Sequence, residues 1–344
     1  MDSVPPRDLM PVTLLTGFLG SGKTTLLRRA LTAPGFSDTA VVINEIGEVA
    51  IDHYLVDFVE GGVFELPGGC LCCAVREDLA QTLRSLIDRR DAGDIRRFRR
   101  IVIETSGLAD PGPILFTLGT DPMLDQRLRL GRVVTVVDAV TGAQTLDRFA
   151  EAARQVAVAD ALVIAKTDLA PLSETLASRL AAFNARAELI VGASAGDPAT
   201  VLFAPSEYPH PNPPPPAEEG AIGAGSATLS PHATHSHGIA AFTIVLEGAI
   251  GRLDFARALG GLAMARGNDL LRVKGIVRFA DRPHSPAVVQ AAQHAMFAPE
   301  WLDDWPDGDH RSRLVFVVHE IMPEEILDHF AFASPSLLHP VARA

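Results

Sequence analysis

Short apolar segments alternate with stretches of helical periodicity over residues 12–191. The apolar segments are 12–16, 41–44, 101–105, 133–138, 161–166 and 188–191. Between the second and third segments, Leu79, Leu83 and Leu86 recur at the spacing of one helix face. Continuous apolar strands separated by helices are typical of a mainly parallel sheet covered by helices on both faces. We therefore predict an α/β domain over residues 1–204.

The alternation stops at a segment rich in proline, glycine and histidine. Residues 205–216 contain seven prolines, and small residues dominate as far as residue 230. Such a composition buries too little apolar surface to order itself, so we predict a linker over 205–237. Strand-like and helical patterns return at 239–246, 253–265, 270–279, 314–318 and 323–330. We predict a smaller α+β domain over 238–344.

The strongest chemical signal is residues 17–25, GFLGSGKTT, which match the phosphate-binding pattern G-x-x-x-x-G-K-[ST] in full. An apolar segment precedes the pattern and helical periodicity follows it, which is the context this loop requires. The loop glycines allow successive N–H groups to approach phosphate oxygens. We predict that the phosphates bind at Gly17, Gly20, Ser21 and Gly22, the β- and γ-phosphates at Lys23, Mg²⁺ at Thr24 and the α-phosphate at Thr25. The domain is thus predicted to be a P-loop NTPase.

An acidic residue and a glycine lie at the end of the 101–105 segment, in the sequence ETSG. A metal-dependent nucleotide hydrolase needs an acid at the end of a strand beside the phosphate loop. We predict that Glu104 holds the magnesium shell or its water and that the Gly107 N–H contacts the γ-phosphate. The alternative is a carboxylate that only caps a turn.

The sequence AKTD at 165–168 indicates which base is bound. GTPases recognise guanine with Asn-Lys-x-Asp, whose aspartate accepts two hydrogen bonds that adenine does not offer. Lys166 and Asp168 keep two of these three groups, and we predict GTP over ATP. Because Ala165 replaces the asparagine, we expect a weaker affinity than the full motif gives. The alternative is an ordinary lysine and aspartate at a helix start.

Cys70, Cys72 and Cys73, the three cysteines of the chain, lie within four residues. Thiolates at this spacing suit Zn²⁺ or Co²⁺ and would leave a fourth position open, as a metal carrier needs. Redox chemistry prefers C-x-x-C over this C-x-C-C spacing, and small core residues are a further alternative.

Two other groups are candidate metal ligands. Glu45 and Glu48 follow the 41–44 segment, where a γ-phosphate-responsive loop is expected, and either ligate a metal or are solvated. His232, His235 and His237 lie at the end of the predicted linker, where they either capture metal or belong to a polar spacer.

Composition restricts the class of partner. The formal charge of −12 opposes non-specific binding to nucleic acid or to an anionic membrane. An arginine cluster at residues 89–100 departs from this balance and is either solvated or a docking patch. No segment approaches the ~20 apolar residues that span a bilayer. Few cysteines and no recognisable signal peptide predict a cytoplasmic protein with reduced thiols.

Together these motifs resemble the CobW family of P-loop GTPases, whose better-understood members are metal chaperones or metal-insertion factors. The residues that carry the resemblance are 17–25, NEIGE (44–48), GGCLCC (68–73), ETSGLADPGP (104–113), VVDA (136–139), AKTD (165–168), and 272–278 and 313–317 of the second domain. The resemblance implies slow, metal-stimulated hydrolysis of GTP, dependence on Mg²⁺, and zinc or cobalt binding at the three cysteines.

The leading hypothesis is a GTP-driven metallochaperone that delivers its ion to a client metalloprotein, whose identity the sequence does not reveal. A homodimer is one expected assembly. A non-catalytic metal buffer or sensor on a P-loop scaffold is the main alternative. A small-molecule kinase would leave Asp168 and the thiol loop unexplained.

Overall fold

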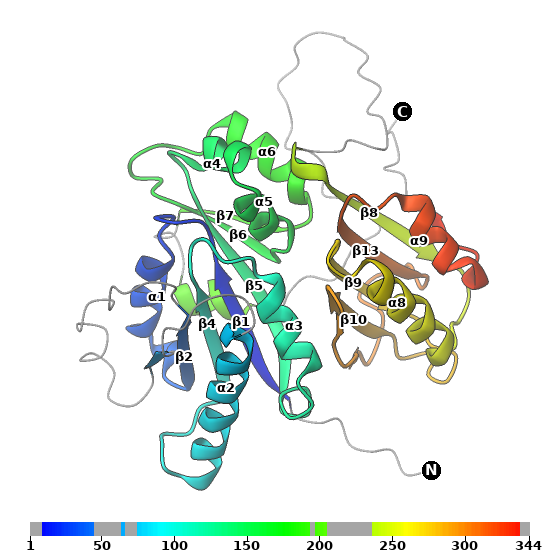
Figure 1. The fold of residues 1–344 in the computed structure, drawn as a ribbon, viewed down its shortest axis with the longest axis horizontal. Coiled ribbons are helices and arrows are strands. Elements are labelled where there is room, and N and C mark those ends of the chain that lie inside the picture. The colour runs from blue at the N-terminus through cyan, green and yellow to red at the C-terminus, as the bar shows by residue number, and fades with distance from the viewer. Residues whose placement is uncertain (1–8, 45–62, 66–73, 193–196, 205–235, 338–344) are drawn as a thin grey trace. The chain divides into compact units, whose positions relative to one another are not determined.

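The computed structural model describes residues 9–44, 63–65, 74–192, 197–204 and 236–337 (Figure 1). The chain divides into two compact units. The first comprises Met1–Leu180, Ala187–Glu207 and Ala295–Ala298, and the second comprises Ala181–Arg186, Tyr208–His294 and Pro299–Ala344. Each unit has its own sheet and is described separately.

The described part of the first unit contains a parallel sheet of seven strands in the order β3-β2-β4-β1-β5-β6-β7. The strands are β1 (Met10–Thr16), β2 (Thr39–Asn44), β3 (Val63–Glu65), β4 (Arg100–Thr105), β5 (Leu128–Asp138), β6 (Ala161–Ala165) and β7 (Glu188–Val191). The predicted parallel α/β architecture is confirmed. The sequence did not predict β3, which has three residues at the edge of the sheet.

Helices connect these strands and cover the sheet. They are α1 (Lys23–Leu31), the 3₁₀ turn η1 (Pro34–Phe36), α2 (Ala74–Ala92), α3 (Gly112–Thr120), α4 (Gly142–Arg148), α5 (Ala150–Ala157), α6 (Glu174–Asn184) and α7 (Pro198–Phe203). Side chains alternate between the two faces of a strand, so β5 shows which helix lies where. Val134 and Val136 pack in the cluster that contains α1 and α7, whereas Thr135 bonds to the backbone of α5.

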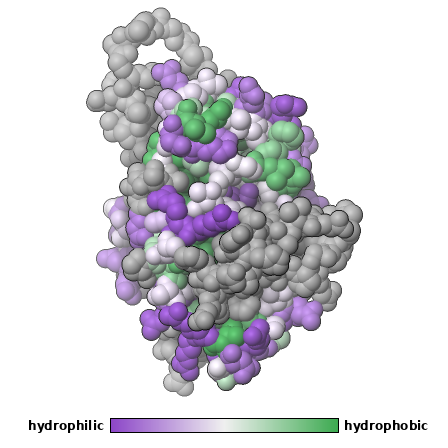
Figure 2. Space-filling view, turned by 90° about the vertical axis from the view of Figure 1, so that its left-hand side faces the viewer, coloured by the Kyte–Doolittle hydropathy of each residue, from purple (hydrophilic) through white to green (hydrophobic). Residues whose placement is uncertain are grey.

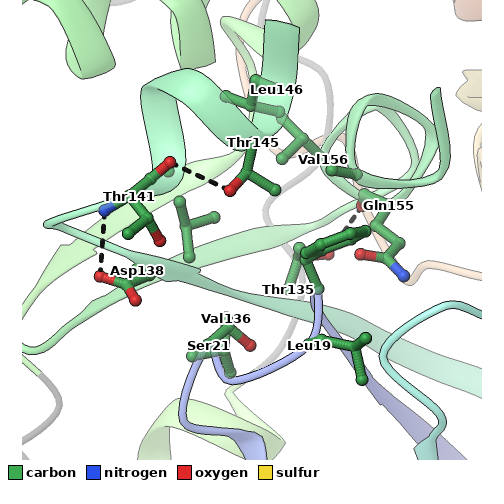
Figure 3. Close-up of a pocket in the computed structure, with 14 residues that line it drawn as sticks. Leu19, Ser21, Thr135, Val136, Asp138, Thr141, Thr145, Leu146, Gln155 and Val156 are labelled. Carbon is green, nitrogen blue, oxygen red and sulfur yellow. Dashed lines mark hydrogen bonds between the residues drawn. The ribbon is translucent and has the colours of Figure 1, made fainter. Parts of the chain in front are cut away.

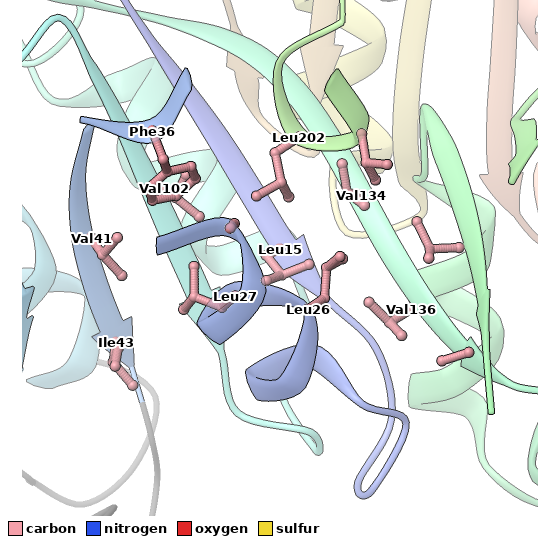
Figure 4. Close-up of a cluster of buried hydrophobic side chains, with 14 residues drawn as sticks. Leu15, Leu26, Leu27, Phe36, Val41, Ile43, Val102, Val134, Val136 and Leu202 are labelled. Carbon is pink, nitrogen blue, oxygen red and sulfur yellow. The ribbon is translucent and has the colours of Figure 1, made fainter. Parts of the chain in front are cut away.

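One hydrophobic cluster of this unit lies between the sheet and α1 (Figure 4). Leu26 and Leu27 of α1 pack against Leu15 of β1 and Val102 of β4, and all four are at most 1% exposed. Each such side chain contributes about 1.5–3 kcal/mol by burial. This packing fixes the start of α1, and with it the loop that precedes α1, against the carboxyl ends of the central strands.

The second unit contains an antiparallel sheet in the order β10-β9-β13-β8-β14, with β12 beside β10. Its elements are β8 (Ile239–Leu246), α8 (Arg252–Arg266), β9 (Leu270–Val277), β10 (Ala287–Ala292), β12 (Glu300–Trp301), β13 (Ser312–His319), α9 (Pro323–His329) and β14 (Ser336–Leu337). The short β11 (Ala295–Met296) is assigned to the first unit. The predicted α+β class is confirmed, although the sequence did not indicate β10, β12 or β14.

The face shown in Figure 2 carries many polar side chains with separate smaller apolar areas. Among the described residues, no helix combines the length and apolar character needed to cross a membrane.

Candidate functional site

The glycine-rich loop connects β1 to α1 at the carboxyl edge of the parallel sheet. Gly17 has φ 141° and Gly22 has φ 107°, backbone conformations that favour glycine. A Cβ atom on Gly17 would collide with the carbonyl oxygen of Val136 in β5. Gly20 also has a positive φ, at 69°, but the space around it is open. The backbone and the close approach to β5 therefore both require glycine at position 17.

Lys23 is the first residue of α1 and is only 8% exposed. Its Nζ donates to the carbonyl oxygen of Gly17 at 2.8 Å and to that of Phe18 at 3.3 Å. The ammonium group is therefore held within the loop by neutral backbone acceptors. A phosphate oxygen is a stronger acceptor for an ammonium group than a neutral carbonyl is.

Glu104 and Thr24 come from neighbouring elements and meet beside the loop. Glu104 of β4 pairs in register with Leu15, the last residue but one of β1. Glu104 therefore lies near the carboxyl end of the neighbouring strand. The Thr24 hydroxyl donates to Glu104 Oε1 at 2.8 Å, and Glu104 is 4% exposed. A hydroxyl and a carboxylate are the hard oxygen donors that Mg²⁺ prefers, so this pair fits a magnesium ion. Thr25, the next residue of α1, is exposed.

The turn after β4 lies directly against the glycine-rich loop. A Cβ atom on Gly107 would come within 2.6 Å of the backbone nitrogen of Leu19. Thr105 Oγ1 donates to Thr16 Oγ1 at 2.8 Å, joining the ends of β4 and β1. Gly107 therefore lies directly against the glycine-rich loop.

Gln155 of α5 also contacts this turn, and the sequence analysis missed it. Its Nε2 donates to the carbonyl oxygens of Gly107 at 3.2 Å and Ala109 at 2.9 Å. The signal available in the sequence was a glutamine beside the alanine and valine residues of this segment, where a polar side chain needs a hydrogen-bond partner.

Lys166 and Asp168 follow β6 at the other end of the same edge. Lys166 adopts a left-handed backbone with φ 59°, which ends β6 at Ala165 rather than at the predicted residue 166. Its Nζ forms an ion pair with Asp138 Oδ2 at 2.6 Å. Asp168 is exposed, whereas Ala165 is buried and would lie 3.4 Å from a Cβ atom on Gly22. The substitution at position 165 is therefore directly beneath the phosphate loop.

Asp138, the last residue of β5, carries the negative charge opposite Lys166. Burial raises the pKa of its carboxyl, but hydrogen bonds from Lys166 and from the N–H groups of Val140 and Thr141 outweigh burial. The net result is a pKa below the ordinary 3.8. Asp138 is therefore ionised at neutral pH and fixes the position of the Lys166 ammonium.

A pocket lies between the glycine-rich loop, β5, α4 and α5 (Figure 3). Its lining includes Ser21, Asp138 and Gln155 together with apolar side chains of Phe18 and Leu146. The buried Ser21 Oγ and Gln155 Oε1 have no hydrogen-bond partner among the described residues.

Several predicted ligands lie outside the described residues. These are Glu45, Glu48, Cys70, Cys72 and Cys73, together with His232 and His235. Within the part of the chain that is described, no group of three or more His, Cys, Asp or Glu side chains is arranged to hold a metal ion.

Family models match both parts of the chain. Residues 11–191 match the CobW/HypB/UreG nucleotide-binding domain, and residues 239–333 match the cobalamin synthesis protein CobW C-terminal domain. The chain belongs to the CobW family. It is 34% identical over 322 residues to the zinc chaperone YjiA of Escherichia coli strain K12, covering 93% of this chain and 97% of that protein.

Other CobW-family proteins and a crystal structure extend this comparison. The zinc-regulated GTPase metalloprotein activator 1 of Schizosaccharomyces pombe is 37% identical over 169 residues, which cover 47% of this chain and 40% of that protein. The crystal structure of Zn(II)-bound YjiA GTPase from E. coli superposes with a TM-score of 0.65 at 31% identity. The superposition covers 94% of this chain and 99% of the YjiA chain. The likeness to this solved structure therefore extends over nearly the whole of both chains.

Proposed function

We propose that this protein is a GTP-hydrolysing metallochaperone that binds zinc, or cobalt, and delivers it to a client metalloprotein in the cytoplasm. The observation that carries the proposal is the contact of Thr24 with Glu104 beside the buried Lys23. The Thr24 hydroxyl meets the Glu104 carboxylate, and the ammonium of the preceding residue, Lys23, is bonded to the carbonyl oxygens of Gly17 and Phe18 in the glycine-rich loop. The names of its relatives, a zinc chaperone and a zinc-regulated GTPase, support the choice of cargo.

The phosphate side of the site would bind and polarise the triphosphate. Lys23 would exchange its carbonyl acceptors for oxygens of the β- and γ-phosphates, and the loop N–H groups and the start of α1 would supply further positive potential. Thr24 and Glu104 would hold Mg²⁺, which neutralises phosphate charge when bound. Glu104 would also orient the attacking water, and Gly107 would donate its N–H to the γ-phosphate. The products would be GDP and inorganic phosphate.

The base side of the site would select guanine. Asp168 is exposed and available to accept from the guanine N1–H and N2–H₂ groups. Lys166, held by Asp138, would contribute its side chain to the base-binding surface. Adenine would leave the Asp168 carboxylate without these donors, which costs a few kcal/mol.

The cargo site would be the thiolates of Cys70, Cys72 and Cys73, with Glu45 and Glu48 contributing ligands to the cargo ion or to Mg²⁺. GTP would order the 44–52 loop and bring the cysteine loop into a metal-binding arrangement, and hydrolysis would release the ion. Such coupling is reciprocal, so bound metal must tighten GTP by the same factor.

A zinc titration with and without a non-hydrolysable GTP analogue tests this proposal on the full chain. We expect the analogue to tighten zinc at least fivefold, near the lower end of typical allosteric coupling. Cys72→Ala should weaken zinc binding and remove the coupling while it leaves nucleotide binding intact. Zinc affinity that is the same with and without nucleotide, together with negligible hydrolysis, would instead identify a metal buffer or sensor.

A further inference from the structure

Gln155 presents a buried amide to the turn that follows β4. It is fully buried in α5, where its neighbours Ala152, Ala153 and Val156 are small or aliphatic. A buried amide is destabilising unless it is hydrogen-bonded. Both donors of this amide are used, and they converge on the carbonyl oxygens of Gly107 and Ala109.

The orientation of this amide is set by its donors. Two carbonyl oxygens lie on one side, so the nitrogen must face them. Gln155 Oε1 faces the other way and has no hydrogen-bond partner among the described residues. Since Gln155 Oε1 accepts no hydrogen bond from the described residues, the two bonds donated by Nε2 determine the orientation of the side chain.

The turn is confined from the opposite side by the glycine-rich loop. Gly107 has no space for a Cβ atom against Leu19, so the turn cannot move closer to the loop. Farther along, Arg154 Nη1 binds Asp110 Oδ2 at 2.8 Å, and Asp110 Oδ1 accepts from the N–H of Gly112 at the start of α3. Consecutive residues of α5 therefore hold both ends of the 107–110 segment.

We propose that Gln155 is a positioning residue for the γ-phosphate contact, an inference that rests on the proposed GTPase function. By fixing the carbonyl groups of Gly107 and Ala109, Gln155 holds the turn in the arrangement in which the Gly107 N–H donates to the γ-phosphate. Arg154 supports the same arrangement through Asp110. GDP lacks the γ-phosphate, so its affinity is independent of this contact.

The test compares dissociation constants for a non-hydrolysable GTP analogue and for GDP, measured with Mg²⁺ on the full chain. Gln155→Met keeps an unbranched buried side chain but removes both donors. We expect it to lower the preference for the analogue over GDP about tenfold, to lower kcat by a similar factor, and to leave GDP affinity within about twofold. Arg154→Met lies at a partly exposed position and should change the same ratio in the same direction, by a smaller factor.

Thr13→Val is the matched control, because it removes a buried bond from Thr13 Oγ1 to the Leu202 carbonyl oxygen, away from the turn. Its preference for the analogue over GDP should match that of the wild type. Equal losses of analogue and GDP affinity in Gln155→Met, or no change in either, would overturn the inference. If Gln155→Met does not fold, an unchanged ratio in Arg154→Met would overturn it. A wild type that does not bind the analogue would instead overturn the proposed function, and the inference with it.

Discussion

Two clusters of buried charged side chains, one in each unit, have different hydrogen-bond partners. In the first unit, the Lys23 ammonium is bonded to neutral carbonyl oxygens, and the Glu104 carboxylate accepts from a threonine hydroxyl. In the second unit, the fully buried Arg313 binds Asp307 at 3.0 Å and Asp309 at 3.3 Å. The carbonyl oxygens that accept from Lys23 and the hydroxyl that donates to Glu104 are neutral groups, whereas Arg313 is bonded to two carboxylates.

This difference separates a site from a structural ion pair. A buried charge is costly unless it is compensated, and full compensation leaves nothing for a ligand to improve. The carbonyl oxygens of Gly17 and Phe18 are weaker acceptors for the Lys23 ammonium than a phosphate oxygen would be. Arg313 can only lose by exchange. We therefore expect substitutions in the two places to affect different measurements.

The largest expected effect is on the stability of the second unit. Arg313→Met leaves Asp307 and Asp309 without their buried partner and should lower the free energy of unfolding by about 3–5 kcal/mol. Nucleotide binding by the first unit should persist. Urea denaturation followed by tryptophan fluorescence would measure this, because both tryptophans, Trp301 and Trp305, belong to the second unit.

Arg311→Met is the control for that experiment. Arg311 also pairs with Asp309, at 2.9 Å, but its side chain is 45% exposed, so the loss should be below about 1 kcal/mol. Equal losses in the two variants would show that the buried pair is not the stabilising one.

Next in size is the effect of Lys23→Ala on hydrolysis. Removal of the Lys23 ammonium, which we propose to contact the triphosphate, should lower kcat about 10²–10³-fold, since preorganised charge stabilises the transition state. The thermal midpoint should change little, and zinc binding without nucleotide should be retained. Lys274→Ala, which removes the same charge from β9, should hydrolyse GTP at the wild-type rate. A loss of zinc binding together with hydrolysis would point to a folding defect.

The smallest effect is a pH dependence of the second unit. Hydrogen bonding to Arg311 is the main cause that lowers the pKa of Asp309 from 3.8 to about 2, with Arg313 adding to it. A lowered folded-state pKa means that the unfolded state binds the proton more readily, so the stabilisation is complete above about pH 4. It should be lost as pH falls towards 2, by about 1–2 kcal/mol.

Urea denaturation between pH 2 and 5 would measure this slope, and Asp309→Asn should flatten it. A wild-type slope that persists unchanged in Asp309→Asn would assign the acid sensitivity to another carboxyl.

The sequence predicts the residues of a local motif better than the residues that meet only in the folded chain. The loop at 17–25 and the acid at Glu104 are recognised from pattern alone, and the structure places Thr24 against Glu104. Asp138 and Gln155 were not predicted to contact Lys166 and Gly107, because such contacts depend on how separate strands and helices pack.

The same reason explains the strands that the sequence missed. β10 is half alanine, a residue with low strand propensity, and its formation depends on pairing with β9 and β12. β3 pairs with β2 over three residues, which is too short for a periodic signal. In β5 the sequence predicted only the apolar part, 133–138, and missed the first five residues, where Arg129, Gly131 and Arg132 interrupt the apolar pattern.

The proposed GTPase function depends most on which nucleotide binds at the carboxyl edge of the parallel sheet. Calorimetry with Mg²⁺ and non-hydrolysable GTP and ATP analogues, on the wild type and on Asp168→Asn, measures it directly. We predict at least a tenfold preference for the guanine nucleotide in the wild type and its loss in the variant, in line with a few kcal/mol of discrimination. Equal affinity of the wild type for the GTP and ATP analogues would contradict the proposed selection of guanine by Asp168.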